Sequence, residues 1–335
     1  MDGRERVKRA VEFRHPDRVP FEWYQHGVGE PDLGRSDLVW VRYEPLSEPV
    51  IVEDGDEVQK TDEWGCTWVS YKSIPTMGQP LGHPLRKWDR IEGFQFPGYD
   101  VDRRFEGLGE EVDRLRDLGK YLVGALDFGL WERLHFLRGL NEAITDLYIH
   151  RERAHLLLER ITEFKLELIK GYSGLGIDCV GFTDDWGDQH RLMIPPKLWV
   201  EVFKPYYERI FGEAKAHGMH AFLHSCGNIR EIIGHLIEAG LDIIQLDAPH
   251  QCDVVRLSEE YSGEICFDCC IDIQKVLPTG DRDLIFEEAR LLTRSLGSVA
   301  GGFIARQYPQ LVHIGIPPEV NEMAYQAFRK WGTYS

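Results

Sequence analysis

The sequence lacks the features of a membrane or secreted protein. Its apolar runs fall short of the about 20 residues that a membrane-spanning helix needs. Residues 1–6 are charged and lead into an amphipathic stretch, unlike a signal peptide. Seven cysteines are an odd number for a full disulfide set, and reduced thiols are the default without a secretory signal. We therefore expect a cytoplasmic protein that does not associate with membranes.

Positive charge is also scarce. Lysine and arginine total 39 against 56 aspartates and glutamates, a net charge of −17, which disfavours nucleic acid as a partner. No Gly-x-Gly-x-x-Gly opens a helix after the early strands, and no Gly-Lys-Ser/Thr phosphate loop occurs. No proline-rich or serine-rich linker and no repeat interrupts the chain, so we expect one domain over 1–335.

What the sequence does contain is an alternation of apolar strands and helices. The first hundred residues are irregular, with a strand at 19–24 and hairpins between 61 and 97. The later strands are predicted at 121–127, 178–183, 220–224, 242–247, 264–268 and 302–305. Helical segments such as 152–170 and 284–296 separate them, which is typical of parallel pairing with right-handed crossovers. We predict an α/β fold, a single (β/α)8 TIM barrel with an irregular N-terminal extension, rather than an open doubly wound sheet.

Polar residues gather at the predicted strand ends. In a parallel barrel the reacting groups project from the carboxyl ends of the strands. The residues at those ends are Glu22, Trp23, Tyr24, His26, Asp127, Asp184, Asp185, His224, Cys226, Asp247, His250, Asp268, Cys269, Cys270 and Arg306. Acids, imidazoles and thiols gathered at one mouth indicate a functional site there.

His224 and Cys226 form the sharpest local motif. Residues two apart in an extended segment face the same side, so both could bind one zinc ion. The helix that follows should favour the thiolate form of Cys226. A third ligand must come from another strand, and Cys270 is our candidate, with Asp268 as the alternative. The competing interpretation is that these thiols are small buried hydrophobic groups.

Three carboxylates are candidate catalytic groups: Asp185, Asp127 and Asp268. Asp184 and Asp185 are adjacent and should face opposite ways, so one of them points into the site. The competing interpretation for each acid is a cap of a turn or loop. The candidate substrate-binding residues are Trp23, Tyr24, His26, Trp186 and Asp247, although aromatic rings often simply pack in the core.

Short segments in a fixed order carry a family resemblance over nearly the whole chain. They are residues 4–7, 16–20, 62–66, 184–187, 222–228, 271–278, 301–304 and 316–319. Together they resemble the uroporphyrinogen decarboxylase superfamily, which also contains cobalamin-dependent methyltransferases. The resemblance implies a single (β/α)8 barrel.

The decarboxylase and methyltransferase branches of this superfamily differ in the residues of their sites. Decarboxylases carry an Arg-Gln-Ala-Gly-Arg segment whose arginines bind substrate carboxylates, whereas this chain has no arginine at 22–26. The methyltransferase branch binds zinc through a His-x-Cys like His224 and Cys226, together with a cysteine after the last strand. Residues 306–310 contain no cysteine, which implies a rearranged site that uses the penultimate strand.

The resemblance and the motif together predict a zinc-dependent methyltransferase. It would exchange a methyl group between a small methylated or methoxylated compound and a corrinoid (cobalamin) carried by a partner protein. A homodimer is compatible with this assignment. The alternatives are a lyase of the uroporphyrinogen decarboxylase type and a non-catalytic barrel that binds a small molecule.

Overall fold

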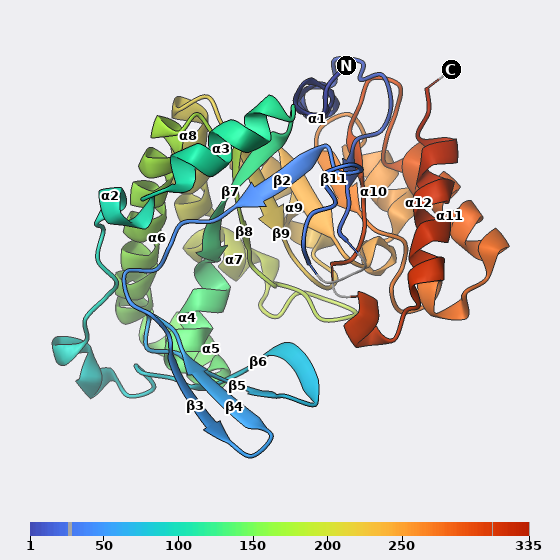
Figure 1. Cartoon of the computed structure of the whole chain (residues 1–335). Coiled ribbons are helices and arrows are strands. Elements are labelled where there is room, and N and C mark those ends of the chain that lie inside the picture. The colour runs from blue at the N-terminus through green and yellow to red at the C-terminus, as the bar shows by residue number, and fades with distance from the viewer. Residues whose placement is uncertain (26–28, 310, 335) are drawn as a thin grey trace.

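Eight parallel strands form the centre of the molecule (Figure 1). The computed structural model describes residues 1–25, 29–309 and 311–334. The strands are β1 (Phe21–Glu22), β2 (Leu38–Val41), β7 (Tyr121–Phe128), β8 (Cys179–Thr183), β9 (His220–His224), β10 (Ile243–Leu246), β11 (Cys266–Cys269) and β12 (Phe303–Arg306). Their order in the sheet is β1-β12-β11-β10-β9-β8-β7-β2, and the seven ladders between these neighbours are parallel.

The two outer members of this sheet meet and close it into a barrel. The backbone N–H of Asp37, just before β2, donates to the carbonyl of Phe21 in β1 at 2.7 Å. The Asp37 carboxylate in turn accepts from the backbone N–H of Phe21 at 2.8 Å. The predicted single (β/α)8 barrel is therefore confirmed. Strand β2 was not predicted from the sequence, and it follows β1 with no helix between them.

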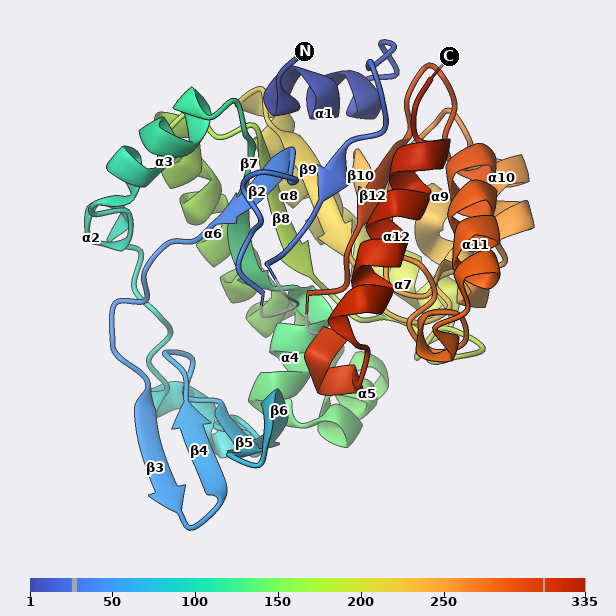
Figure 2. The same ribbon diagram turned by 45° about the vertical axis from the view of Figure 1, so that its right-hand side comes forward.

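Helices surround the barrel (Figure 1). They are α1 (Gly3–Val11), α2 (Val101–Arg104), α3 (Leu108–Asp117), α4 (Leu130–Arg138), α5 (Leu140–Ile149), α6 (Arg151–Gly174), α7 (Pro196–Val202), α8 (Lys204–Ala216), α9 (Arg230–Glu238), α10 (Val254–Tyr261), α11 (Arg282–Ser295) and α12 (Pro318–Trp331). The first helix lies across the amino ends of the strands (Figure 2), where Val7 and Val11 pack against Tyr121, Cys179 and Phe222. A substrate must therefore enter at the carboxyl ends.

A second, antiparallel sheet makes up much of the N-terminal extension. It contains β3 (Val50–Asp54), β4 (Glu57–Thr61), β5 (Thr67–Tyr71) and β6 (Ile74–Gly82), in that order. Strands β5 and β6 lie within the hairpin region predicted between 61 and 97, whereas the hairpin of β3 and β4 precedes it. Trp68 anchors the sheet to the barrel, because its ring stacks on Phe128 at 5.3 Å and meets the edge of Phe136 at 4.7 Å. The extension thereby supports the carboxyl end of β7.

Within the part of the chain that the structure describes, no helix combines the length and the apolar character that crossing a membrane requires.

Candidate metal and substrate site

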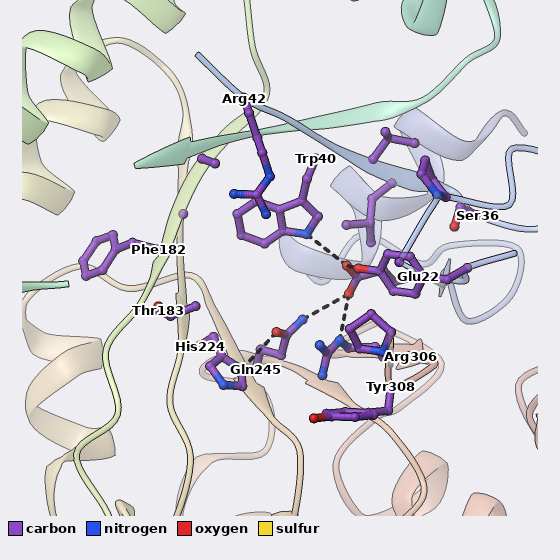
Figure 3. Close-up of a pocket in the computed structure, with 18 of the residues that line it drawn as sticks. Glu22, Ser36, Trp40, Arg42, Phe182, Thr183, His224, Gln245, Arg306 and Tyr308 are labelled. Carbon is purple, nitrogen blue, oxygen red and sulfur yellow. Dashed lines mark hydrogen bonds and ion pairs between the residues drawn. The ribbon is translucent and has the colours of Figure 1, made fainter. Parts of the chain in front are cut away.

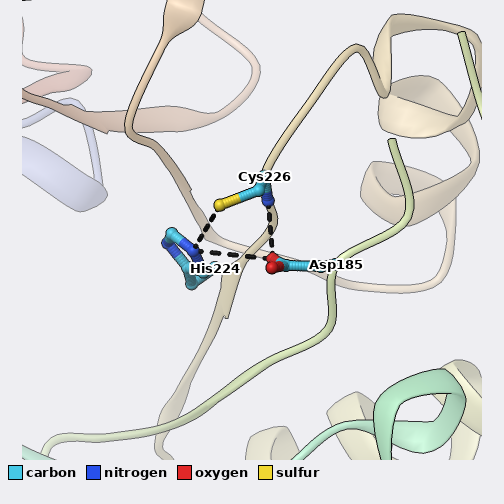
Figure 4. A group of neighbouring side chains, drawn as sticks. All are labelled: Asp185, His224 and Cys226. Carbon is cyan, nitrogen blue, oxygen red and sulfur yellow. Dashed lines mark hydrogen bonds and ion pairs between the residues drawn. The ribbon is translucent and has the colours of Figure 1, made fainter. Parts of the chain in front are cut away.

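Three potential metal ligands converge beyond the carboxyl ends of β8 and β9 (Figure 4). The Nε2 atom of His224 lies 3.4 Å from the Sγ of Cys226 and 3.6 Å from the Oδ1 of Asp185. Their ligand atoms all lie within 4.8 Å of one another. Among the described residues, this is the one group of three or more such side chains that meets at this spacing.

Two glycines bring the loops after β8 and β9 together. A Cβ atom at Gly187 or at Gly227 would collide with the backbone of the opposite loop, and Gly227 also has a φ of 81°. The close approach allows the backbone N–H of Cys226 to donate to the Oδ1 of Asp185 at 2.8 Å. The glycines thus place the carboxylate of one loop beside the thiol of the other.

The adjacent acids Asp184 and Asp185 have different roles, as their alternation along the chain predicts. Asp184 is fully buried and accepts hydrogen bonds from the backbone N–H groups of the first turn of α4, at 2.8 to 3.2 Å, and from the hydroxyl of Tyr207. Burial raises the pKa of Asp184 to about 6. It is a structural cap of α4, whereas Asp185 is partly exposed and faces the metal-ligand group.

The ring of His224 is oriented by Gln245 in the neighbouring strand. The Nε2 group of Gln245 donates to Glu22 and to Asp268, both at 3.0 Å, so its Oε1 atom is the free acceptor. This oxygen lies 3.0 Å from the Nδ1 of His224, which must therefore carry the proton. The Nε2 lone pair of His224 is left to face Cys226 and Asp185, as a metal ligand requires.

The expected thiolate form of Cys226 is wrong for the protein without a metal. Burial raises the pKa of this thiol, and the negative charges of Asp185 and Asp247 raise it further. Helix α9 begins only at Arg230, so its first turn lies too far along the chain to offset these effects. Excess negative charge around a protonated thiol favours the arrival of a cation.

Cys270 does not join this group, which corrects the predicted ligand set. Its buried thiol donates to the backbone carbonyl of Asp247 at 3.3 Å. The third candidate ligand is Asp185, which the sequence had suggested as a catalytic acid.

Asp268 lies inside the barrel and accepts a hydrogen bond from Gln245. Its side chain is fully buried within β11, and its Oδ1 has no hydrogen-bond partner among the described residues. Burial raises the pKa of Asp268 well above its usual value, and the neighbouring Glu22 raises it further. Asp268 is therefore a buried member of the hydrogen-bond network behind His224.

A cavity of about 620 Å³ opens beside His224 (Figure 3). The predicted site residues Tyr24, Asp127 and Asp247 line it, whereas His26 lies outside the described residues. The cavity is also lined by Glu22 and Arg306, which belong to the polar residues at the predicted strand ends, and by four residues outside the prediction: Trp40, Arg42, Gln245 and Tyr308. Nothing in the sequence marks Gln245 within its apolar strand.

The carboxylates of the cavity are held by arginines. Asp127 pairs with Arg133, which also binds Asp62 at 2.8 Å. Arg306 pairs with Asp247, and its Nε lies 3.3 Å from Glu22. Burial alone would raise the pKa of Asp247, but the positive charge of Arg306 holds it below its usual value. Asp247 therefore remains charged, and the arginines hold all three carboxylates in place.

Two predicted substrate contacts, Trp23 and Trp186, are wrong because both rings belong to the packed core. Trp23 is 1% exposed and packs against Tyr325, with ring centroids 5.1 Å apart. Trp186 is fully buried, stacks on Trp131 at 5.3 Å and donates its indole N–H to Tyr207. Neither side chain lines the cavity.

A solved structure shares this fold over nearly the whole chain. The solved structure of a methyltransferase from Methanosarcina mazei superimposes with a TM-score of 0.69 at 16% identity, covering 99% of each chain. D-psicose 3-epimerase from Clostridium cellulolyticum H10, solved with D-tagatose, gives a TM-score of 0.42 at 11% identity, covering 67% of this chain and 83% of that chain. A comparison with curated protein sequences gives no significant match. The family model of uroporphyrinogen decarboxylase (URO-D) matches residues 69–302, more than half of the sequence, so the chain belongs to the URO-D family.

Proposed function

We propose that the protein is a zinc-dependent methyltransferase that exchanges a methyl group between a small methylated or methoxylated compound and a corrinoid protein. The observation that carries this proposal is the convergence of Asp185, His224 and Cys226 at the carboxyl end of the barrel. His224 belongs both to this group and to the lining of the cavity, so the metal ligands and the substrate space adjoin. The overall likeness to a methyltransferase fold is consistent with the proposal.

The three side chains fit zinc in chemistry and in spacing. Zinc prefers imidazole, thiolate and carboxylate ligands, and its bonds of about 2.0 to 2.3 Å put tetrahedral ligand atoms about 3.3 to 3.7 Å apart. The separations of 3.4 and 3.6 Å from His224 to Cys226 and Asp185 lie in this range. Three protein ligands would leave one position for a substrate atom, the arrangement of catalytic rather than structural zinc sites.

Zinc bound here would supply Lewis acidity to the heteroatom that carries the methyl group. The residues of the chain supply orientation and charge. Gln245 fixes the ring of His224, and Asp247, 4.0 Å from its Nε2, adds negative charge on the cavity side. Burial raises the pKa of Glu132, and the charges of Asp185 and Asp184 raise it further.

The size of the cavity favours a small substrate. Sites for compact organic ligands typically enclose about 300 to 1,000 Å³, and the cavity of about 620 Å³ falls within this range. In this proposal the corrinoid is the second substrate, delivered by its partner protein to the mouth of the barrel.

The proposal is tested by metal analysis and by methyl transfer to free cob(I)alamin. Protein purified without chelator should contain about one zinc per chain. It should form methylcobalamin from at least one of a panel of methyl ethers, thioethers and methylamines, and a chelator should abolish the reaction. Less than about half an equivalent of zinc, even after zinc is added back, would contradict the proposal. So would a zinc-loaded protein that methylates no cob(I)alamin with any member of the panel.

A further inference from the structure

Arg42, directly after β2, lines the cavity and has no ion-pair partner among the described residues. Figure 3 shows its side chain among the residues that line the cavity. Among the described residues, no hydrogen bond or ion pair partners this exposed side chain. The other arginine of the lining, Arg306, is buried and held between Asp247 and Glu22.

The nearby carboxylates have cations of their own. Asp127 is paired with Arg133, and Asp247 and Glu22 share Arg306. Glu30 also lines the cavity and is exposed, as Arg42 is, but among the described residues it forms no ion pair with Arg42. A guanidinium that lines a cavity without an internal partner is available to an anionic ligand.

Apolar side chains line part of the same cavity. Trp40 and Phe128 are both partly exposed and contribute to this lining. The ring of Trp40 is fixed, because its indole N–H donates to Glu22 at 2.9 Å. A ligand that suits these surroundings has an apolar body with one anionic end.

We propose that Arg42 binds a carboxylate of the substrate, so that the substrate of the site is a small monocarboxylate with an apolar body. A guanidinium matches a carboxylate with two parallel hydrogen bonds. Binding at Arg42 would leave the rest of the molecule to the apolar side chains of the same cavity, which His224 also lines. This inference rests on the proposed function in one respect: both take the cavity beside the metal ligands as the substrate site.

The test is binding of matched acids and amides to the full chain, measured by calorimetry or by ligand-observed NMR. Benzoate is compared with benzamide, and butyrate with butyramide, since each pair differs in charge but hardly in shape. In the wild type at least one acid should bind about tenfold more tightly than its amide. In Arg42→Gln this preference should fall to within about threefold, with Arg42→Lys in between. Arg103→Gln is the matched control, because Arg103 is exposed in α2, outside the cavity lining, and should leave the preference unchanged.

Measurements on the protein as purified and after treatment with chelator separate Arg42 from a carboxylate bound to metal, since the effect of Arg42→Gln should appear in both. The inference is wrong if acid and amide bind equally to the wild type, or if the preference survives in Arg42→Gln. It is also wrong if neither acid binds at about 20 mM, far above the range of specific affinities. Binding is measured without turnover, so methyl transfer from neutral donors with no acid preference would overturn this inference and leave the proposed function intact.

Discussion

Gln245 accepts a hydrogen bond from the Nδ1 of His224 at 3.0 Å, and the two residues are direct neighbours in the ladder between β9 and β10. On its other side Gln245 is the ladder partner of Asp268 in β11. Its amide group cannot turn over without placing its oxygen against Glu22 and Asp268. The barrel interior thus selects the tautomer of a histidine whose other nitrogen faces the candidate zinc site.

Gln245→Leu should weaken zinc binding about 10- to 100-fold, the usual effect of losing the partner that orients a metal-binding histidine. The leucine fills similar space but accepts no hydrogen bond, so the His224 ring loses its fixed orientation. Competition with a chelator of known zinc affinity measures the change. Gln245→Glu keeps an acceptor oxygen and should bind zinc more tightly than Gln245→Leu does.

Gln307→Leu is the matched control for that experiment. Gln307 is an equally buried glutamine after β12, and it accepts from the backbone N–H of Tyr24 rather than from His224. Its replacement should leave zinc affinity unchanged. Equal losses in the two leucine variants would assign the effect to general damage of the barrel.

Cys226→Ala should lose zinc while the barrel stays folded. The thiol lies in a loop beyond the strands, so in metal-free buffer the melting temperature should move by no more than about 2 °C. Cys270→Ala gives the opposite pattern: it should keep zinc but lose about 1 kcal/mol of stability, because it empties space in the core. Metal analysis and thermal melts distinguish the two variants, and zinc loss in Cys270→Ala would restore the ligand set predicted from the sequence.

Asp185→Asn and Asp184→Asn should distinguish the candidate zinc ligand, Asp185, from the residue that caps α4, Asp184. The first substitution keeps an oxygen for the N–H of Cys226 but removes the charge, so zinc should bind about 10- to 100-fold more weakly with little change in stability. Asp184→Asn places a neutral amide against the N–H donors of α4. It should lower the free energy of unfolding by about 1 to 2 kcal/mol and leave the zinc content unchanged. Denaturant unfolding and zinc titration together check the pair. Normal zinc affinity in Asp185→Asn would remove this residue from the ligand set.

The part of the site that follows from local geometry could be predicted from the sequence. Alternation in an extended segment places His224 and Cys226 on one side, and the same rule separates Asp184 from Asp185. The third ligand depends instead on the contact between two loops through Gly187 and Gly227, which no spacing along one strand reveals. That is why Cys270 was chosen and Asp185 was assigned another role.

The strand β2, and with it Trp40 and Arg42, escaped prediction for a different reason. The strand has four residues and follows β1 without a helix, so it breaks the alternation by which the other strands were found. The network of Glu22, Gln245 and Asp268 needs the register of the closed barrel, since its members come from β1, β10 and β11. Trp186 was misassigned because its position after a strand does not show that its ring turns back into the core.

Uroporphyrinogen should not be decarboxylated at a useful rate, although the chain belongs to the family named for that reaction. A substrate with eight carboxylates needs several arginines to face it, because each guanidinium matches one carboxylate with two bonds. The cavity lining offers Arg42 and Arg306, and Arg306 is already held by Asp247 and Glu22. The acids of the lining are Glu22, Glu30, Asp127 and Asp247, and they would repel a polyanion at several contacts together. A monocarboxylate needs only Arg42. Anaerobic incubation with uroporphyrinogen, followed by analysis for coproporphyrinogen, measures this directly. Robust product that survives Arg42→Gln would show that the charge balance of the cavity does not decide the substrate, and would make decarboxylation the better assignment.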